Sequence, residues 1–349
     1  MIQAITSINS PVRQIKAKAE LYNGSALVNT FYTDLVELSI ERKGEEGKFF
    51  GFGICQRLNI KLIDINREKD ITTANSFKVY FDNICNFPYF TTTEVNRDEN
   101  TNQLSITAYD ALKKAEAHNV EELGLPTSYT ILDFAVKVAD FLGVNGINLI
   151  GIPNADISFS LSYADGANFE GTETLKAALT AIAEATQTVY YLDGDNTLVF
   201  KRFNKDAVAD LVIDRASYIL LDSKTNRKLQ TISNTTELGD EVSASIAEIG
   251  TTQFIRDNPF LELREDIADI LDNAIATMGG LTINQFSCSW RGNYLLECGD
   301  KIELITKDGG SAFSYVINDT INYNGAFSQS TSWSYIDGNQ TATNPTTLG

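Results

Sequence analysis

Apolar and polar residues alternate over several short segments in the first third of the chain. The segments are Ile15–Leu21, Asp34–Arg42, Leu58–Ile65 and Leu104–Tyr109. Such alternation places one face of a strand on a core and the other face in water. The Asn23-Gly24 pair that follows the first segment is typical of a hairpin turn. Several short strands at this spacing predict a barrel or a sandwich over residues 1–110.

The middle of the chain changes to a helical period. Thr130 and Asp133 form a capping-box pattern, an apolar stripe follows it, and Gly143 should end that helix. The stripe consists of Ile131, Phe134, Ala135, Val138, Phe141 and Leu142. Residues 145–171 are rich in Gly, Asn and Asp and are expected to be irregular.

A second helix is predicted to start near Thr172, which can cap its first turn. Its apolar stripe consists of Leu175, Ala178, Leu179, Ile182 and Ala183. A strand over Thr188–Leu192, a turn at residues 193–196 and a return strand over Thr197–Phe203 should follow. This unit is a helix laid on a two-stranded ribbon.

The last part returns to strands, with one helix inserted. Asn258-Pro259 is typical of a helix start and Gly279-Gly280 of a helix end, so the helix is predicted over 259–278. Its stripe consists of Phe260, Leu263, Ile267, Ile270, Leu271, Ile275 and Met278. Asn324-Gly325 predicts a hairpin near the end of the chain.

These patterns predict an α+β fold that is mainly β. Two β-barrel-like domains, residues 1–110 and 214–340, flank a mixed α/β domain over 111–213, and the inserted helix 259–278 belongs to the second barrel. Residues 341–349 are expected to form a flexible tail.

The chain is strongly acidic. Its 349 residues carry a formal net charge of −18, and its densest basic runs, such as Lys16-Ala17-Lys18 and Arg227-Lys228, are short. Binding of duplex DNA through its phosphates needs a basic patch, so specific DNA binding is not expected. The chain has no run of eighteen apolar residues and no signal-peptide pattern at Met1, so we expect no membrane insertion and folding in the cytoplasm where it is made.

Four cysteines occur, at positions 55, 85, 288 and 298, and no two of them form a CxxC pair. A zinc site is therefore not predicted. We expect free thiols in a reducing compartment. The alternative is a bridge between Cys288 and Cys298, which lie on neighbouring predicted strands.

Catalytic chemistry finds little support in the sequence. His118 is the single histidine, whereas zinc peptidases need several such ligands. The carboxylate pairs Glu45-Glu46 and Glu121-Glu122 lie in predicted loops, where solvation explains them. We therefore predict no catalytic, cofactor-binding or metal-binding residues and no cofactor.

Two motifs could be mistaken for ligand sites. The run Phe49–Gly53 has neither the third glycine nor the lysine of a phosphate loop, so its phenylalanines are expected in a core or an interface. The turn at residues 193–196 begins like a calcium loop. It lacks the required glycine and glutamate, because Leu198 and Asn204 occupy those positions.

Three signatures in order carry a family resemblance. They are the strand-to-helix transition Thr107–Leu112, the helix and hairpin Thr172–Phe203, and the Gly-Asp turn within Cys298–Leu304. Together they resemble the baseplate-hub family of bacterial viruses, which includes tail-associated proteins of long-tailed phages and hubs of contractile tails. The match to the family's barrel-to-helix transition implies that Asp110 caps the next helix.

The resemblance implies a structural virion protein rather than an enzyme. It would be the tail-tip or baseplate hub of a phage or prophage, a homotrimer that closes the tail tube and opens for DNA passage without binding DNA specifically. Its expected partners are the distal tail protein ring, the tape-measure protein and downstream fibre or spike proteins. Its expected location is the virion tail, assembled in the host bacterial cytoplasm.

Two other classes stay open at this point. One is a tail-borne cell-wall hydrolase, either a peptidase or a glycosidase, and the other is a solitary carbohydrate-binding β protein. For the hub, the net charge of −18 further predicts an acidic channel wall that repels DNA phosphates.

Overall fold

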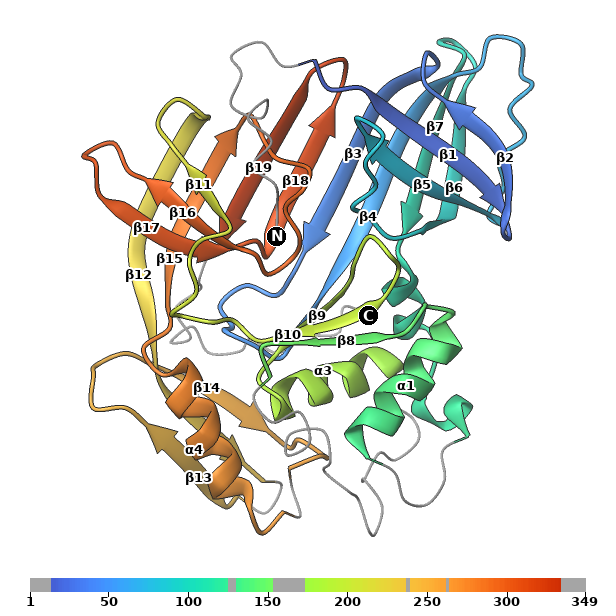
Figure 1. The fold of residues 1–349 in the computed structure, drawn as a ribbon. Helices are drawn as coiled ribbons and strands as arrows, with labels where there is room; N and C mark the ends of the chain where they lie inside the picture. The colour runs from blue at the N-terminus through green and yellow to red at the C-terminus, as the bar shows by residue number, and fades with distance from the viewer. Residues whose placement is uncertain (1–13, 125–129, 153–172, 237–238, 262–263, 334–349) are drawn as a thin grey trace, which may run out of the picture.

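The computed structural model describes residues 14–124, 130–152, 173–236, 239–261 and 264–333 (Figure 1). The predicted cap Thr172, the stripe residue Leu263 and the predicted tail 341–349 lie outside these ranges. Within them the protein is α+β and mainly β, as predicted. Two β regions lie side by side in Figure 1, with the helices below them.

The first β region follows the predicted alternation. Its strands are β1 (Ala17–Asn23), β2 (Ala26–Phe31), β3 (Leu35–Lys43), β4 (Phe52–Ile63), β5 (Asn75–Phe81), β6 (Phe90–Asp98) and β7 (Gln103–Tyr109). They pair in the order β3-β4-β7-β6-β5-β1-β2. The hairpin at Asn23-Gly24 is confirmed, with Gly24 in the left-handed conformation at a φ of +58°. Strand β4 begins at Phe52, earlier than the predicted Leu58.

The mixed part carries the helices. Its elements are the 3-10 helices η1 (Ala111–Glu116) and η2 (Val120–Leu123), helices α1 (Ile131–Leu142) and α3 (Leu175–Ala185), and strands β8 (Ile147–Ile150), β9 (Val189–Leu192) and β10 (Leu198–Lys201). The capping box of Thr130 and Asp133 starts α1 and Gly143 ends it, as predicted.

Two local predictions in this part need correction. Thr174, and not the predicted Thr172, caps α3, because its hydroxyl accepts a hydrogen bond from the Ala177 N–H at 3.2 Å. The stretch expected to be irregular contains β8, which pairs in parallel with β10. Strand β8 can be only four residues long because β10 supplies its hydrogen-bonding partner. No local sequence pattern reveals that partner.

The second β region contains the remaining strands. They are β11 (Leu211–Ile213), β12 (Tyr218–Thr235), β13 (Glu241–Ser245), β14 (Thr251–Arg256), β15 (Thr282–Trp290), β16 (Lys301–Ile305), β17 (Ser311–Tyr315), β18 (Asn318–Tyr323) and β19 (Phe327–Trp333). A four-stranded path runs β12-β15-β19-β18, and β11-β16-β17 form a separate small sheet. Closure of either β region into a barrel stays a prediction.

The inserted helix α4 spans Ile267–Met278 and packs on β12 and β13. It begins at Ile267 and not at the predicted Pro259. The Asn258 side chain instead caps a turn by accepting from the Phe260 N–H at 3.0 Å, and it donates to the Ala181 carbonyl of α3 at 2.9 Å. Phe260 and Leu261 are fully buried, so this segment anchors α3 before the helix starts.

The two β regions repeat one strand order. In the first region, the four strands lie in the order β3-β4-β7-β6. The last two of them are a hairpin, β6 and β7, whose second strand lies next to β4. In the second region, the order is β12-β15-β19-β18, and the hairpin of β18 and β19 likewise has its second strand next to β15. This order supports an internal duplication that residue identities do not show.

One seam joins the two units into a continuous sheet. Strand β18 pairs antiparallel with β3 from Asn318↔Lys43 to Tyr323↔Leu38. Beneath the seam, the Arg42 guanidinium lies 3.7 Å from the Asp319 carboxylate, and both side chains are almost fully buried. Arg42 also donates to the Leu296 carbonyl at 2.6 Å. The seam is therefore fixed by buried polar contacts as well as by the strand ladder.

Candidate assembly surface

One face of the continuous sheet is polar over the seven strands from β15 to β6. The strand registers align two rows of neighbours across it. The rows are Ser289, Ser330, Thr320, Glu41, Arg57 and Tyr109, and then Ser328, Asn322, Ser39, Asn59, Thr107 and Glu94. The opposite face carries the core, including Leu38, Ile60 and Ile321. A sheet buried on one face and wet on the other can line an aqueous space.

Charges on this polar face are largely paired. Arg57 lies 3.9 Å from Glu41, and the Lys61 ammonium lies 2.5 Å from Glu37. The Asn59 amide donates to the Ser39 hydroxyl and to Glu41, both at 3.3 Å. Hydroxyl and amide groups therefore dominate a face that belongs to a strongly acidic chain.

The eight-stranded path ends at β6 on one side and at β12 on the other. Strand β6 pairs with β5 at Phe90 and Thr91, and none of the described strands pairs with its outer edge from Thr92 to Asp98. Strand β12 pairs with β15 from Tyr218 to Lys228 and with β13 and β14 between Leu229 and Thr235. Unpaired edges expose backbone N–H and C=O groups that can pair with another chain.

The three sequence signatures converge where the mixed part joins the β regions. Asp110, at the strand-to-helix transition, is fully buried and accepts hydrogen bonds from the N–H groups of Gln56 (2.8 Å) and Leu112 (3.1 Å). It thus caps η1, as the resemblance implied, and ties it to β4. Burial raises the pKa of the Asp110 carboxyl to about 7.

The hairpin signature docks on the same strand. Strand β9 pairs in parallel with the start of β4, with Gly53 opposite Tyr190. A methyl group at Gly53 would lie only 2.4 Å from the Tyr190 ring, so glycine is required for this close approach. Phe49, Phe50 and Phe52 are buried beside it, which confirms their predicted place in a core.

The Gly-Asp signature ties the second β region to the hairpin. Asp300 accepts from the Lys201 ammonium of β10 at 2.8 Å and from the Glu297 N–H at 2.9 Å. A methyl group at Gly299 would lie 3.1 Å from the Lys201 side chain. All three signatures therefore position the parts of the fold relative to one another.

Comparison with solved structures identifies this arrangement. The chain superposes on a tail protein from Neisseria meningitidis with a TM-score of 0.58 and 12% identity, covering 90% of this chain and 95% of that one. A prophage MuSo2 43 kDa tail protein from Shewanella oneidensis gives 0.59 and 12% identity, with 91% and 98% covered. Prophage tail protein gp18 from Listeria monocytogenes gives 0.55 and 13% identity, with 91% and 94% covered.

The chain has the fold of phage tail proteins. The predicted resemblance is thus confirmed at the level of the fold. No protein-family model matches the sequence, and no curated protein is significantly similar to it. At identities this low, the likeness shows the fold alone.

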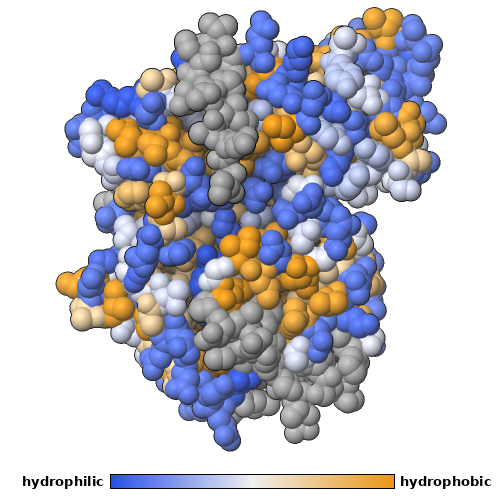
Figure 2. All heavy atoms as spheres, viewed as in Figure 1, coloured by the Kyte–Doolittle hydropathy of each residue, from blue (hydrophilic) through white to orange (hydrophobic). Residues whose placement is uncertain are grey.

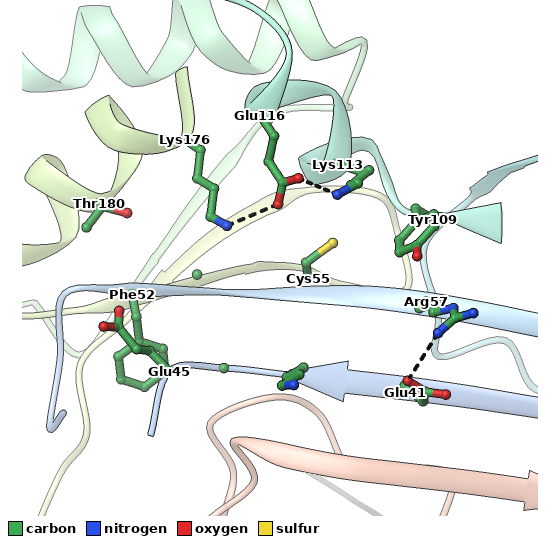
Figure 3. Close-up of a pocket in the computed structure, with 13 residues that line it drawn as sticks. Glu41, Glu45, Phe52, Cys55, Arg57, Tyr109, Lys113, Glu116, Lys176 and Thr180 are labelled. Carbon is green, nitrogen blue, oxygen red and sulfur yellow. Dashed lines mark hydrogen bonds and ion pairs between the residues drawn. The ribbon is translucent and has the colours of Figure 1, made fainter. Parts of the chain in front are cut away.

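A pocket of about 500 Å³ lies where the polar face of β3 and β4 meets η1 and α3 in this tail-protein fold (Figure 3). Figure 3 shows Glu116 between Lys113 and Lys176, and the Lys176 ammonium lies 3.0 Å from it. The hydrogen bond from Lys113 lowers the pKa of Glu116. Glu116 is therefore paired with two lysines of the pocket, Lys113 and Lys176.

Cys55, which lines this pocket, is a poor nucleophile. Burial, and then the neighbouring Asp110 carboxylate, raise the pKa of its thiol. The thiol lies 3.3 Å from Asp110 and donates its hydrogen bond there. Since the thiolate is the reactive form, the pocket offers no activated sulfur.

The sequence candidates for chemistry have structural roles. His118 follows η1, lies 2.8 Å from Glu122 and contacts Phe141 edge-on, in the partly exposed helix-end position predicted for it. Glu121 and Glu122 lie in η2 and not in a loop, and Glu122 completes a capping box with Asn119. The turn at residues 193–196 joins β9 to β10 as a hairpin, with Asp193 accepting from the Thr197 N–H at 2.9 Å.

The four cysteines are free, and Cys288 and Cys298 do not form a bridge. Within the described ranges, no three His, Cys, Asp or Glu side chains lie close enough to hold a metal ion. No described helix is long and apolar enough to cross a membrane. The sequence shows the polar positions of the alternating strands, but it does not show that the strands of both β regions join them into one polar face.

Proposed function

We propose that this protein is a structural component of a phage or prophage tail, the hub at its distal end, and that it acts as a homotrimer without catalytic activity. The observation that carries the proposal is the repeated four-stranded unit. Two such units in one chain let three copies present six similar sheets around an axis. The tail-protein fold of the solved relatives supports the same assignment.

The polar face suits the wall of the central channel. Serine, threonine and asparagine side chains hold water and offer no fixed cations to phosphates, so DNA can pass without being retained. This wall is closer to neutral than the acidic one expected from the net charge, because Arg57 and Lys61 are paired with acids on the face. The remaining acidic residues then keep the outer surface soluble.

The proposed partners follow from this position in the tail. A ring of three copies would contact the distal tail protein ring on one side and fibre or spike proteins on the other, with the tape-measure protein inside the tube. The protein would assemble in the cytoplasm of the host bacterium and end in the virion tail. We further propose that residues 1–110, 111–213 and 214–340 are the building blocks of each copy.

A tail reconstruction tests the assembly. We expect three copies at the distal end of the tube, with the polar face toward the axis. Six copies around the axis would refute the trimer, and a location on the side of the tail would refute the hub.

Zymography on bacterial cell walls tests the absence of catalysis. We expect no clearing zone from the purified chain. A zone that disappears when a single carboxylate such as Glu116 is replaced by glutamine would establish the cell-wall hydrolase instead.

A further inference from the structure

We propose that the pocket between the first β region and the mixed part is a carboxylate-binding site, which receives an acidic side chain of a partner polypeptide. Its volume of about 500 Å³ lies in the range of cavities that hold small ligands (Figure 3). The inference goes beyond the proposed function. Its test uses the isolated chain, so its failure would leave the hub assignment standing.

The pocket is positively charged although the protein is acidic. The cationic side chains of its lining are Lys43, Arg57, Lys113 and Lys176. The carboxylates of its lining are Glu41, Glu45 and Glu116. The lining therefore carries one net positive charge, whereas the whole chain carries −18. This balance suits a ligand group with a single negative charge, because the three carboxylates repel a more highly charged anion.

Arg57 has hydrogen-bond donors to offer to such a group. Its ion pair with Glu41 spans 3.9 Å, which is too long for a hydrogen bond. No described residue accepts a hydrogen bond from the Arg57 guanidinium, and its Nε is buried without a partner. The N–H groups of arginine form a planar fork that matches the two oxygens of a carboxylate. Arg57 can therefore bind a carboxylate that enters the pocket.

Lys43 lies close enough to share that carboxylate. The β3–β4 ladder places Glu41 opposite Arg57 and Lys43 opposite Cys55, so Lys43 is the diagonal neighbour of Arg57. Diagonal neighbours on one face are about 7–8 Å apart, within reach of long side chains. None of the described residues forms an ion pair with the Lys43 ammonium. The two cations on these strands can thus converge on one ligand group.

Lys113 adds positive charge from the opposite wall of the pocket. It belongs to η1, and its Nζ lies 5.4 Å from the centre of the Tyr109 ring. The Arg57 guanidinium lies 5.9 Å from the same ring, because Tyr109 stands opposite Arg57 on the β4–β7 ladder. Figure 3 shows these three side chains together at one end of the pocket. The positive potential of both elements therefore acts where a carboxylate would bind.

The carboxylates of the lining indicate what the rest of the ligand must supply. Glu41 and Glu45 accept hydrogen bonds but cannot donate them, so the ligand needs donors beside its negative charge. A peptide backbone has an N–H donor on each side of an acidic residue. Figure 2 shows mainly hydrophilic residues over the viewed side of the first β region, so few apolar groups compete for the ligand there. An acidic residue within a polypeptide fits these groups better than a phosphate does.

Isothermal titration calorimetry with two capped tripeptides tests the site in the full chain. One peptide has a glutamate between two glycines, and the other has a glutamine in its place. Because their shapes are nearly the same, the difference between them reports on the carboxylate. We expect the glutamate peptide to bind about tenfold more tightly at low salt. The difference should shrink in about 1 M NaCl, because the Debye length falls to about 3 Å and the lining is partly exposed.

Three variants locate the binding. Arg57→Met should weaken binding of the glutamate peptide about tenfold. Lys61→Met removes a cation from the same strand and the same face, but outside the pocket, and should leave the affinity unchanged. Glu41→Gln removes the carboxylate that competes for Arg57 and should strengthen the binding. Damage to the fold would not produce such a gain in affinity.

Three further probes separate a polypeptide from other anions. They are glutarate, which lacks a peptide backbone, glucuronate, which is an acidic sugar, and inorganic phosphate. We expect the glutamate peptide to bind more tightly than each of them. A probe that binds more tightly than the peptide, and is lost in Arg57→Met, would overturn the polypeptide partner in favour of that anion. Equal binding of the two tripeptides, or wild-type affinity in Arg57→Met, would overturn the carboxylate site.

Discussion

The buried pair at the seam leads to the most demanding prediction. Replacing Arg42 with methionine removes the cation 3.7 Å from Asp319 and the hydrogen bond that Arg42 donates to the Leu296 carbonyl. Asp319 would keep its bonds from the Gln329 amide and the Thr331 hydroxyl, at 2.8 Å each, but would lose its counter-charge.

The expected cost is large because the site is dry. The side chains of Arg42 and Asp319 are 2% and 0% exposed. Removing one member of a buried ion pair typically costs about 3–5 kcal/mol, since the other charge stays buried without compensation. We expect Arg42→Met to lower the free energy of unfolding by this amount in urea denaturation at pH 8.

The cost should depend on pH in a defined direction. Burial already raises the pKa of Asp319, and loss of Arg42 must raise it further. A carboxyl whose folded pKa lies above its unfolded value contributes stability at low pH, and that stability is lost as the pH rises through the folded pKa. The deficit of Arg42→Met should therefore shrink between pH 8 and pH 5.

Two further variants complete the experiment. Adding Asp319→Asn to Arg42→Met removes the uncompensated charge and should recover most of the loss at pH 8. Lys61→Met breaks the ion pair between Lys61 and Glu37. Because both of these side chains are 47% exposed, it should lower the free energy of unfolding by less than about 1 kcal/mol. A loss below about 1 kcal/mol for Arg42→Met, or a double variant no more stable than the single one, would refute this account of the seam.

Three other predictions concern single groups. Truncation of Ile270 to alanine on the buried face of α4 should cost about 2–5 kcal/mol, and a measured loss below about 0.5 kcal/mol would mean that this face is exposed. Because the pKa of Asp110 is raised to about 7, its contribution to stability should fall as the pH rises through 7. Asp110→Asn should therefore flatten the dependence of the free energy of unfolding on pH in this range. An unchanged dependence would contradict the raised pKa of Asp110. Burial raises the pKa of both Cys288 and Cys298 to about 12, so iodoacetamide at pH 8 should label them only after unfolding, as mass spectrometry of the native and the denatured chain can show.

Local patterns in the sequence were sufficient for the elements whose stability is decided nearby. The capping box at Thr130 starts α1, and the stripe from Leu175 to Ala183 is buried in α3. Each of these is marked by a pattern that spans only a few residues, either a side chain that bonds to the next turn or an apolar face that repeats every turn. The α+β class followed from the same short-range signals.

The tertiary structure decided what depends on distant partners. Asn258-Pro259 reads locally as a helix start, but burial of Phe260 against α1 and the bond from Asn258 to α3 hold it as a turn. Strand β8 exists because β10 lies beside it. The β18–β3 seam and the repeated strand order arise from pairings between strands that are distant in the sequence, which residue periodicity does not encode. Periodicity shows which side of a strand faces the core, but the choice of neighbouring strand depends on how the whole chain packs.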